Sequence, residues 1–149
     1  MTFTNISNNA ECLCLRDSYA DVVNIFARKV RKAPDMKEGD FRSNFEKDRL
    51  PATDSCDDVC GIHGVSIEIW NEESAVTLLE KYQTTANYSP KYKNNLSIFK
   101  LKDGAGVVKY TPNQKEYNKF HYDLYKEDFF TIDHLDLIEM IPLIPTKDA

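Results

Sequence analysis

The sequence has no long apolar run and no excess of basic charge, and each absence excludes a class of protein. No apolar stretch approaches the roughly 20 residues that a membrane-spanning helix needs. The first residues lack the basic start and the apolar core of a secretory signal. The 24 acidic residues outnumber the 19 basic ones, which disfavours sequence-independent nucleic-acid binding. We therefore expect a cytoplasmic protein with neither membrane nor nucleic-acid partners.

The chain also lacks internal repeats, low-complexity tracts and any shift in composition that would mark a domain boundary. We expect a single globular domain over residues 1–149, with 1–10 and 146–149 loosely held. A chain of this length buries roughly two-thirds of its unfolded surface, so it can fold without disulfides. In the cytoplasm its four cysteines are expected as thiols, metal ligands or a redox pair.

The strongest strand pattern lies at Val65–Trp70. Aliphatic residues at 65, 67 and 69 alternate with Ser66, Glu68 and Trp70. A two-residue period places the two sets on opposite faces of a strand, and the aliphatic face belongs to the core. The Ser66, Glu68 and Trp70 face is left for solvent, for a second packing layer or for a ligand cleft.

Two main helices are expected around this strand. Apolar residues at helical spacing after Asp17 and Ser18 predict a helix over 18–31. A strand over 24–30 is the competing interpretation, because Val, Ile and Phe are plentiful there. Asn71 as N-cap, with an acidic first turn, predicts a second helix over 71–86. Asp40 is expected to cap a shorter helix that ends at Leu50–Pro51.

The remaining apolar segments predict strands. A weak alternation at 11–16 indicates a short strand, and 120–125 alternates clearly. Segments 96–102 and 107–111 predict a hairpin around Asp103–Gly106. A capped turn is expected further on, near Thr131 or Asp133. Segment 137–144 is either an edge strand or an irregular cover, because Pro142 and Pro145 cannot donate to a ladder.

These elements together predict an α+β fold. We expect one largely antiparallel sheet of about four to six strands, with the 18–31 and 71–86 helices packed on it.

Three candidate zinc ligands, Cys56, Cys60 and His63, lie within eight residues, and Cys12 or Cys14 would supply a fourth. The alternative is that the cysteines are small buried residues and His63 is a polar residue at the entrance to a strand. A Cys60–His63 nucleophile pair is a third interpretation. The neighbouring acidic residues lack the ligand order of a calcium loop and are expected to form a solvated loop; they are Asp54, Asp57 and Asp58.

Arg28, Ser66 and Glu139 occur in an order that resembles the Arg, Ser, Glu sequence of ADP-ribosyltransferase-like domains. The resemblance implies NAD held on a split sheet, with Arg28 toward the cofactor phosphates and Ser66 supporting the nicotinamide pocket. It also implies that Glu139 stabilises an oxocarbenium-like ribose, and Trp70 is a further candidate contact for the cofactor. The chain departs from the family pattern in having one Ser where the family has Ser-Thr-Ser, and no Glu-X-Glu or Gln-X-Glu before Pro142.

Seven aromatic residues between 110 and 130 form the last notable pattern. A surplus beyond what one sheet buries would suit a protein partner, because interfaces are enriched in aromatic residues. We therefore expect a small accessory or interaction protein without catalysis or cofactor, which binds a partner or self-associates. The alternatives are a small NAD-using transferase with its cleft on the Ser66, Glu68 and Trp70 face, and a zinc-stabilised binding domain.

Overall fold

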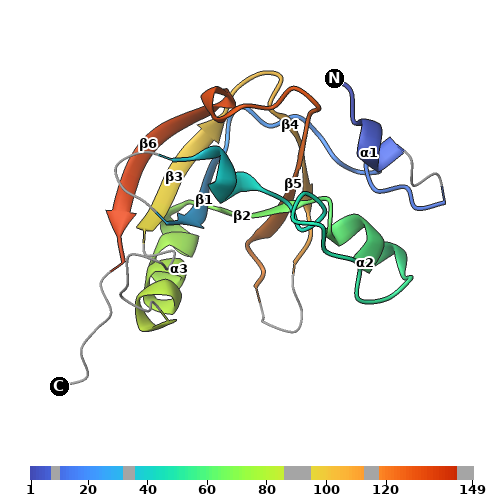
Figure 1. Cartoon of the computed structure of the whole chain (residues 1–149). Coiled ribbons are helices and arrows are strands. Elements are labelled where there is room, and N and C mark those ends of the chain that lie inside the picture. Colours follow the sequence, from blue (N-terminus) through green and yellow to red (C-terminus); the bar gives the residue numbers. More distant parts are fainter. Residues whose placement is uncertain (8–10, 32–35, 86–94, 113–117, 144–149) are drawn as a thin grey trace.

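The computed structural model describes residues 1–7, 11–31, 36–85, 95–112 and 118–143. These residues form one antiparallel sheet of six strands in the order β4-β5-β2-β1-β3-β6 (Figure 1). The strands are β1 Ile25–Val30, β2 Val65–Ile69, β3 Asn95–Leu101, β4 Gly106–Tyr110, β5 His121–Lys126 and β6 Leu135–Pro142. The helices are α1 Thr4–Ser7, α2 Cys56–Gly61 and α3 Glu72–Thr85, with 3-10 turns η1 Glu38–Phe41 and η2 Ile132–His134.

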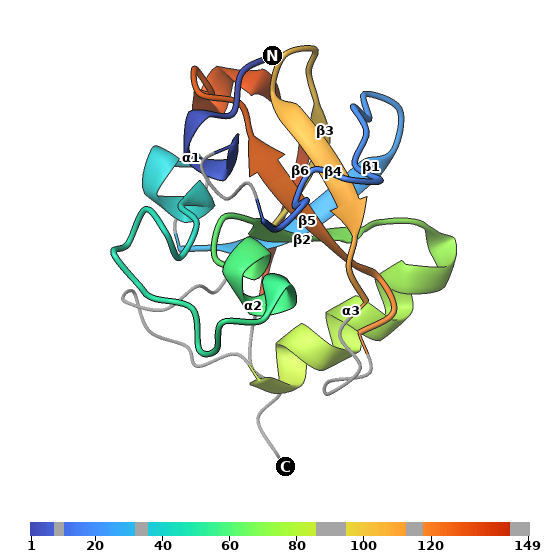
Figure 2. The ribbon, with the colours of Figure 1, turned by 90° about the vertical axis from the view of Figure 1, so that its right-hand side faces the viewer.

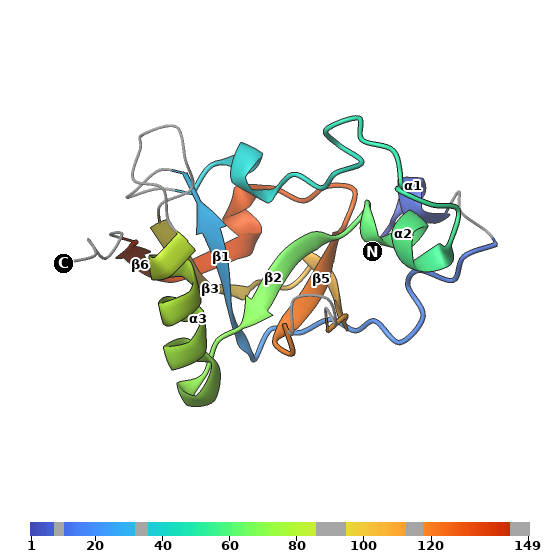
Figure 3. The same cartoon turned by 90° about the horizontal axis from the view of Figure 1, so that it is seen from below.

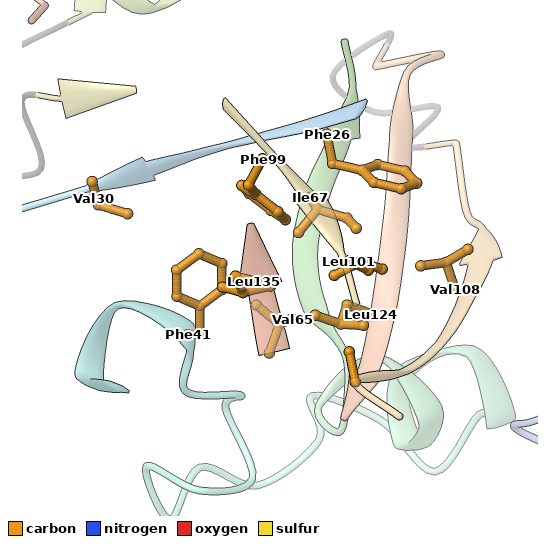
Figure 4. Close-up of a cluster of buried hydrophobic side chains, with 11 residues drawn as sticks. Phe26, Val30, Phe41, Val65, Ile67, Phe99, Leu101, Val108, Leu124 and Leu135 are labelled. Carbon is orange, nitrogen blue, oxygen red and sulfur yellow. The ribbon is translucent and has the colours of Figure 1, made fainter. Parts of the chain in front are cut away.

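The sheet is strongly bent, and its inner, concave face holds the main core (Figures 1 and 4). Residues from both ends of the sheet meet there, because Val108 of β4 and Leu135 of β6 belong to one buried cluster. Phe41 of η1 closes this core and meets the Phe99 ring edge-on, with 5.5 Å between the ring centroids. The other buried members are Phe26, Val30, Val65, Ile67, Phe99, Leu101, Ala105 and Leu124.

The outer, convex face is covered in two separate places. Over β1 and β3, α3 places Leu79 and Tyr82 on a buried patch that includes Ala27 and Ile98. Over the start of β4 and the end of β5, the N-terminal segment and α2 cover Val107 and Tyr125. Figure 2 shows α2 in front of the sheet near β5 and β2, with α3 lower in the view. Figure 3 shows β2 running from the side of α2 toward α3. Part of the outer face of β5 and β4 remains between these two covers.

The alternation predicted for 65–70 is confirmed as strand β2. Val65 and Ile67 are buried on the inner face, and Ile69 is half-buried beside them. On the outer face Ser66 is exposed, whereas Glu68 is only 4% exposed and Trp70 packs beside α3. The outer set therefore includes one buried carboxyl that the pattern did not indicate.

The helix predicted over 18–31 is wrong, and the competing strand interpretation is confirmed. Residues 25–30 form β1 between β2 and β3. Phe26 and Val30 enter the inner core, while Ala27 lies under α3, so the side chains alternate between the two faces of the sheet as in a strand. Asp21 holds the preceding turn by accepting hydrogen bonds from the backbone N–H groups of residues 23 and 24. Pairing on both sides of the strand outweighs the local helical spacing. The prediction of two main helices packed on the sheet is therefore not confirmed.

The hairpin predicted around Asp103–Gly106 is also wrong, although both of its strands exist. β3 pairs with β1 and β6, while β4 pairs with β5 at the other end of the sheet. The glycine that begins β4 serves a different purpose, since a Cβ on Gly106 would lie 2.1 Å from the backbone oxygen of Tyr125. Close approach to β5, rather than a tight hairpin, requires glycine at that position.

Other predictions have mixed outcomes. The 71–86 helix is confirmed as α3, with Asn71 accepting a hydrogen bond from the Ser74 N–H at 2.9 Å. The strand at 120–125, the capped turn after Thr131 and the edge-strand interpretation of β6 are also confirmed. The strand at 11–16 is wrong, because this segment forms turns, and the helix after Asp40 is replaced by η1, which ends at Phe41.

Some predicted features lie outside the described residues, including Ala86, Tyr117 and Pro145. Residues 8–10 and 146–149 of the termini are also outside them. Residues 1–7 contact the end of β5, where the Thr4 N–H donates to the Asp128 carboxylate at 2.9 Å.

Gly106 offers a test of the way β4 joins the sheet. Gly106→Ala should lower the free energy of unfolding by at least about 2 kcal/mol, because its φ of +146° and the contact with Tyr125 both exclude a side chain. Gly39→Ala is the matched control, since a Cβ there has nothing within 4 Å. Urea unfolding of both variants measures the difference. Equal stabilities would contradict the close approach of β4 to β5.

Candidate functional site

A cleft of about 850 Å³ opens on the outer face of β4 and β5, beside α2. Its volume falls in the range of roughly 300–1,000 Å³ that is typical of small-molecule sites. One wall consists of α2 and Leu13, and the floor consists of outward-facing residues of β5 and the end of β4. The lining residues with polar side chains are Asp57, Asp58, Lys109, Tyr110, Thr111, His121, Asp123 and Tyr125.

Strand register places the polar groups of the floor in two rows. Asp123 of β5 lies opposite Lys109 of β4 on one side and opposite Ser66 of β2 on the other. His121 lies opposite Glu68 in the next row of the same face. Residues two apart in a strand point the same way about 6.6 Å apart, so the imidazole and the carboxyl face the cleft together.

His121 is held in one orientation by Thr111. Its Nδ1 lies 2.7 Å from the Thr111 carbonyl oxygen and 2.9 Å from the Thr111 hydroxyl. A carbonyl oxygen only accepts hydrogen bonds, so Nδ1 carries the proton in the neutral ring and donates it. The lone pair of the neutral imidazole is then on Nε2, which is the arrangement of an oriented base.

Asp123 is a buried carboxyl on the floor of the same cleft, with 7% of its surface exposed. Burial raises the pKa of Asp123, while His121, a hydrogen bond from the Thr111 side chain and Lys109 oppose the shift. Gly64 makes room for this carboxyl, because a Cβ there would lie 2.6 Å from Oδ1 of Asp123. The protonated form of Asp123 therefore persists to higher pH than that of an exposed aspartate.

The charges around the floor are mainly acidic. Asp57 and Asp58 of α2 line the wall, and Lys109 is the one Lys or Arg among the lining residues that the structure describes. Its ammonium donates to the backbone oxygen of Cys14 at 3.4 Å. Burial raises the pKa of Tyr125, and the charges of Asp123 and Asp57 add to that rise. Tyr125 thus stays a phenol and a hydrogen-bond donor at neutral pH.

The wall of the cleft is attached covalently. Disulfides join Cys12 to Cys56 and Cys14 to Cys60, and so tie the 11–16 segment to α2. The thiols expected from the sequence are therefore not the form in this structure. Disulfides are typical of oxidising compartments, and the cytoplasmic location stays a prediction.

The predicted zinc ligands do not gather as a set in the disulfide form. His63 is buried with its ring against that of Phe45, with 4.5 Å between the ring centroids and an interplanar angle of 35°, and burial lowers the pKa of His63. It lines a separate small cavity with Lys126 and Phe130, whereas Cys56 and Cys60 line the large cleft. Within the described residues, no group of three or more His, Cys, Asp or Glu side chains is arranged to hold a metal ion. Zinc binding by the reduced chain stays a prediction.

Arg28 and Ser66 come together, but Glu139 does not join them. The Arg28 guanidinium donates from Nη1 to the Ser66 carbonyl oxygen at 2.7 Å and from Nε to the Asp40 carbonyl oxygen at 2.7 Å. Burial lowers the pKa of Arg28 to about 10, against the opposing charge of Asp40. Glu139 pairs with Ile98, on the outer face and two strands away from β1.

Arg28 and Glu139 therefore lie on opposite faces of the sheet, since Arg28 pairs with Ser97 and Ala27 pairs with Ile98. The Ser66 side chain faces outward with Asp123, away from the Arg28 guanidinium. Trp70, the other candidate cofactor contact, packs with Leu79 and Tyr82. The arrangement that the ADP-ribosyltransferase resemblance implies is not assembled here.

His121 and Asp123 are the functional candidates that sequence reasoning missed. Their alternation with Phe120, Tyr122 and Leu124 was visible, and it correctly indicated a strand. The pattern that points to them is the presence of a histidine and an aspartate, two residues apart, on the polar face of the strand. Recognising it required the pairing of β5 with β2, which spans about 55 residues of sequence and is not encoded locally.

Comparison of the chain with models of protein families, with curated proteins and with solved structures finds no match. Among the described residues, no helix is both long and apolar enough to cross a membrane. We therefore infer the chemistry of the cleft from the contacts of the residues that line it.

The raised pKa of Asp123 predicts a specific dependence of stability on pH. The folded protein holds this proton to higher pH than the unfolded chain, so the free energy of unfolding falls as pH rises from below the ordinary value of 3.8 through the folded pKa. Asp123→Asn removes that dependence. Wild type should therefore lose stability relative to Asp123→Asn as pH rises, by about 1.4 kcal/mol for each unit of pKa shift.

Urea unfolding between pH 3.5 and 8 measures this difference. Asp103→Asn controls for the change in net charge, because Asp103 lies in an exposed turn. A wild-type stability that rises with pH relative to Asp123→Asn would contradict the burial of this carboxyl.

Proposed function

We propose that the protein is a small acid–base enzyme that hydrolyses a neutral or cationic polar substrate in the β4–β5 cleft. The observation that carries the proposal is the orientation of His121 by Thr111, beside the buried carboxyl of Asp123. A base with a fixed tautomer and an acid with a raised pKa, side by side in one cleft, are the two groups that hydrolysis requires. An interaction protein without catalysis, which the sequence favours, stays a prediction.

His121 is the base in this scheme. Its Nε2 takes a proton from a water molecule, and the resulting hydroxide equivalent attacks the carbonyl or acetal carbon of the substrate. Protonated Asp123 gives its proton to the leaving oxygen as the bond to carbon breaks. The two proton transfers balance, since one proton reaches Nε2 from water and one leaves the Asp123 carboxyl, and exchange with solvent then restores both groups. Lys109 and the Tyr125 phenol are donors available to a developing oxyanion.

The charge of the lining restricts the substrate. Asp57 and Asp58 line the cleft together with one ammonium group, that of Lys109, so a phosphate or sulfate ester would meet net repulsion. Tyr110, Pro112 and Leu13 supply an apolar rim for an aromatic or aliphatic group. Neutral esters, neutral glycosides and their cationic analogues are the compatible classes.

A panel of p-nitrophenyl compounds tests the chemistry. Wild type should release p-nitrophenol from neutral or amine-bearing esters or glycosides and not from p-nitrophenyl phosphate. His121→Gln should lower kcat about 10²- to 10⁴-fold with little change in KM, because it removes a base rather than a binding contact. His134→Gln is the matched control, since His134 lies in η2, outside the residues that line the cleft.

The tautomer of His121 can be tested without any substrate. Nitrogen-15 NMR of the imidazole should find the proton of neutral His121 on Nδ1. A proton on Nε2 would contradict the base geometry. A His121→Gln enzyme as active as wild type would contradict the proposed role directly.

A binding role is the second candidate, supported by the outer edge of β6. Among the residues that the structure describes, β6 pairs with β3 alone and ends the sheet. Leu137 is 37% exposed and Ile138 is 50% exposed, at a register irregularity between Ile98 and Phe99 of β3. A bulged edge resists simple strand addition, so association there would occur through these side chains. We propose a second copy of the chain as the partner.

Self-association at β6 should be visible by sedimentation velocity at increasing protein concentration. Ile138→Lys should shift the chain toward monomer, because it places a charge in the apolar contact. Val76→Lys, at a residue 71% exposed on α3, is the matched control and should leave association unchanged. A wild-type chain that stays monomeric at several hundred micromolar would exclude this second candidate.

A further inference from the structure

All four cysteines of the chain meet at one place, where the 11–16 segment crosses α2. The Cα atoms of Cys12 and Cys56 are 5.3 Å apart, and those of Cys14 and Cys60 are 5.2 Å apart. The two pairs join segments that are 44 and 46 residues apart in sequence. Two independent long-range contacts thus place four sulfur atoms within one small region.

The two cysteines of each segment lie close together along the backbone. Cys56 and Cys60 are four residues apart in α2, so their Cβ atoms lie about 5–6 Å apart on one helix face. Cys12 and Cys14 are connected by a tight turn in which the Cys14 N–H donates to the Cys12 carbonyl oxygen at 2.8 Å. Each element therefore carries two cysteines that pair with two on the other element, and four cysteines contributed two by two are a common ligand set of structural zinc.

We propose that the reduced chain binds one zinc ion through Cys12, Cys14, Cys56 and Cys60. A dithiol or phosphine reductant first converts the two disulfides to four thiols, which takes up four electrons and four protons. Zinc then displaces the thiol protons as the four thiolates coordinate it. Tetrahedral bonds of about 2.3 Å place neighbouring sulfurs about 3.8 Å apart, a separation that Cα distances of 5.3 and 5.2 Å accommodate by rotation of the side chains.

This ligand set differs from the one that sequence spacing indicated, because it contains four cysteines and excludes His63. The His63 ring is buried against Phe45 and lines the cavity formed with Lys126 and Phe130. Moving it to the cysteines would remove that ring contact. Cys56 is exposed and Cys60 is half-buried, which leaves a route for the metal to enter.

The zinc form would preserve the wall of the cleft under reducing conditions. Either two disulfides or one zinc ion fixes α2 to the 11–16 segment, and α2 carries the residues that face His121 and Asp123. The same attachment would therefore be available in both an oxidising and a reducing compartment. The inference is independent of the proposed hydrolysis, since it concerns the wall rather than the reacting groups.

Zinc content of the full chain tests the inference. Protein reduced with a phosphine, exchanged into zinc chloride without oxygen and then freed of excess metal should contain about one zinc per chain. Cobalt chloride in place of zinc should give the intense visible bands of a tetrahedral thiolate site. The disulfide form should bind less than about a tenth of an equivalent, because its sulfurs carry no exchangeable proton.

Variants distinguish the two ligand sets. Cys14→Ser should reduce zinc affinity by at least tenfold, whereas His63→Gln should retain one equivalent. Alkylation with iodoacetamide followed by mass spectrometry is the second readout, and zinc should protect four thiols that a chelator exposes. This readout needs only the wild-type chain, so a Cys14→Ser protein that fails to fold does not compromise the test.

Two results would overturn the inference. One is a reduced wild-type chain that binds less than about a tenth of an equivalent of zinc and leaves its thiols unprotected. The other is loss of zinc in His63→Gln with full retention in Cys14→Ser. Neither result depends on whether the cleft hydrolyses any substrate, so the two proposals fail separately.

Discussion

The register between β2 and β5 is the constraint on which the rest of the molecule depends. Val65 and Ile67 pair with Leu124 and Tyr122, and all four side chains face the inner core. Full burial of each aliphatic side chain contributes about 1.5–3 kcal/mol. A slip of one residue would turn these groups to the outside and would bring Asp123 into the core, where a carboxylate without partners is costly. Burial of the inner face thus determines which residues line the cleft.

The same constraint explains what could be predicted from the sequence. Alternation is a local property, so β2 and β5 were recognisable from Val65–Ile69 and from Phe120–Tyr125. α3 was recognisable because Asn71 and its first turn act within four residues. Which strands lie beside one another is not local. Gly104 has the positive φ that a turn needs, yet the strands flanking it diverge to different ends of the sheet.

The segment 24–30 shows how pairing decides between two locally compatible structures. Its apolar residues fit the spacing of a helix almost as well as that of a strand. No Gly or Pro within 24–30 excludes either structure. In the structure Ala27 packs under α3 while its neighbour Phe26 packs inside, and only a strand between β2 and β3 satisfies both contacts. The information that resolves this ambiguity comes from residues 65–69 and 95–101. A single window of sequence does not contain it.

The cleft exists because the outer face is covered in two places rather than one. α3 begins three residues after β2 and covers the outer face of β1 and β3. α2 ends four residues before β2 and covers the same face at the other end of the sheet, over β4 and β5. The floor between them carries Asp123, whose burial disfavours its charged form and costs stability at neutral pH. Gly64 leaves space for that carboxyl, and Thr111 contacts both Asp123 and His121. A group that costs stability and yet has a built environment is better explained by chemistry in the cleft than by packing alone.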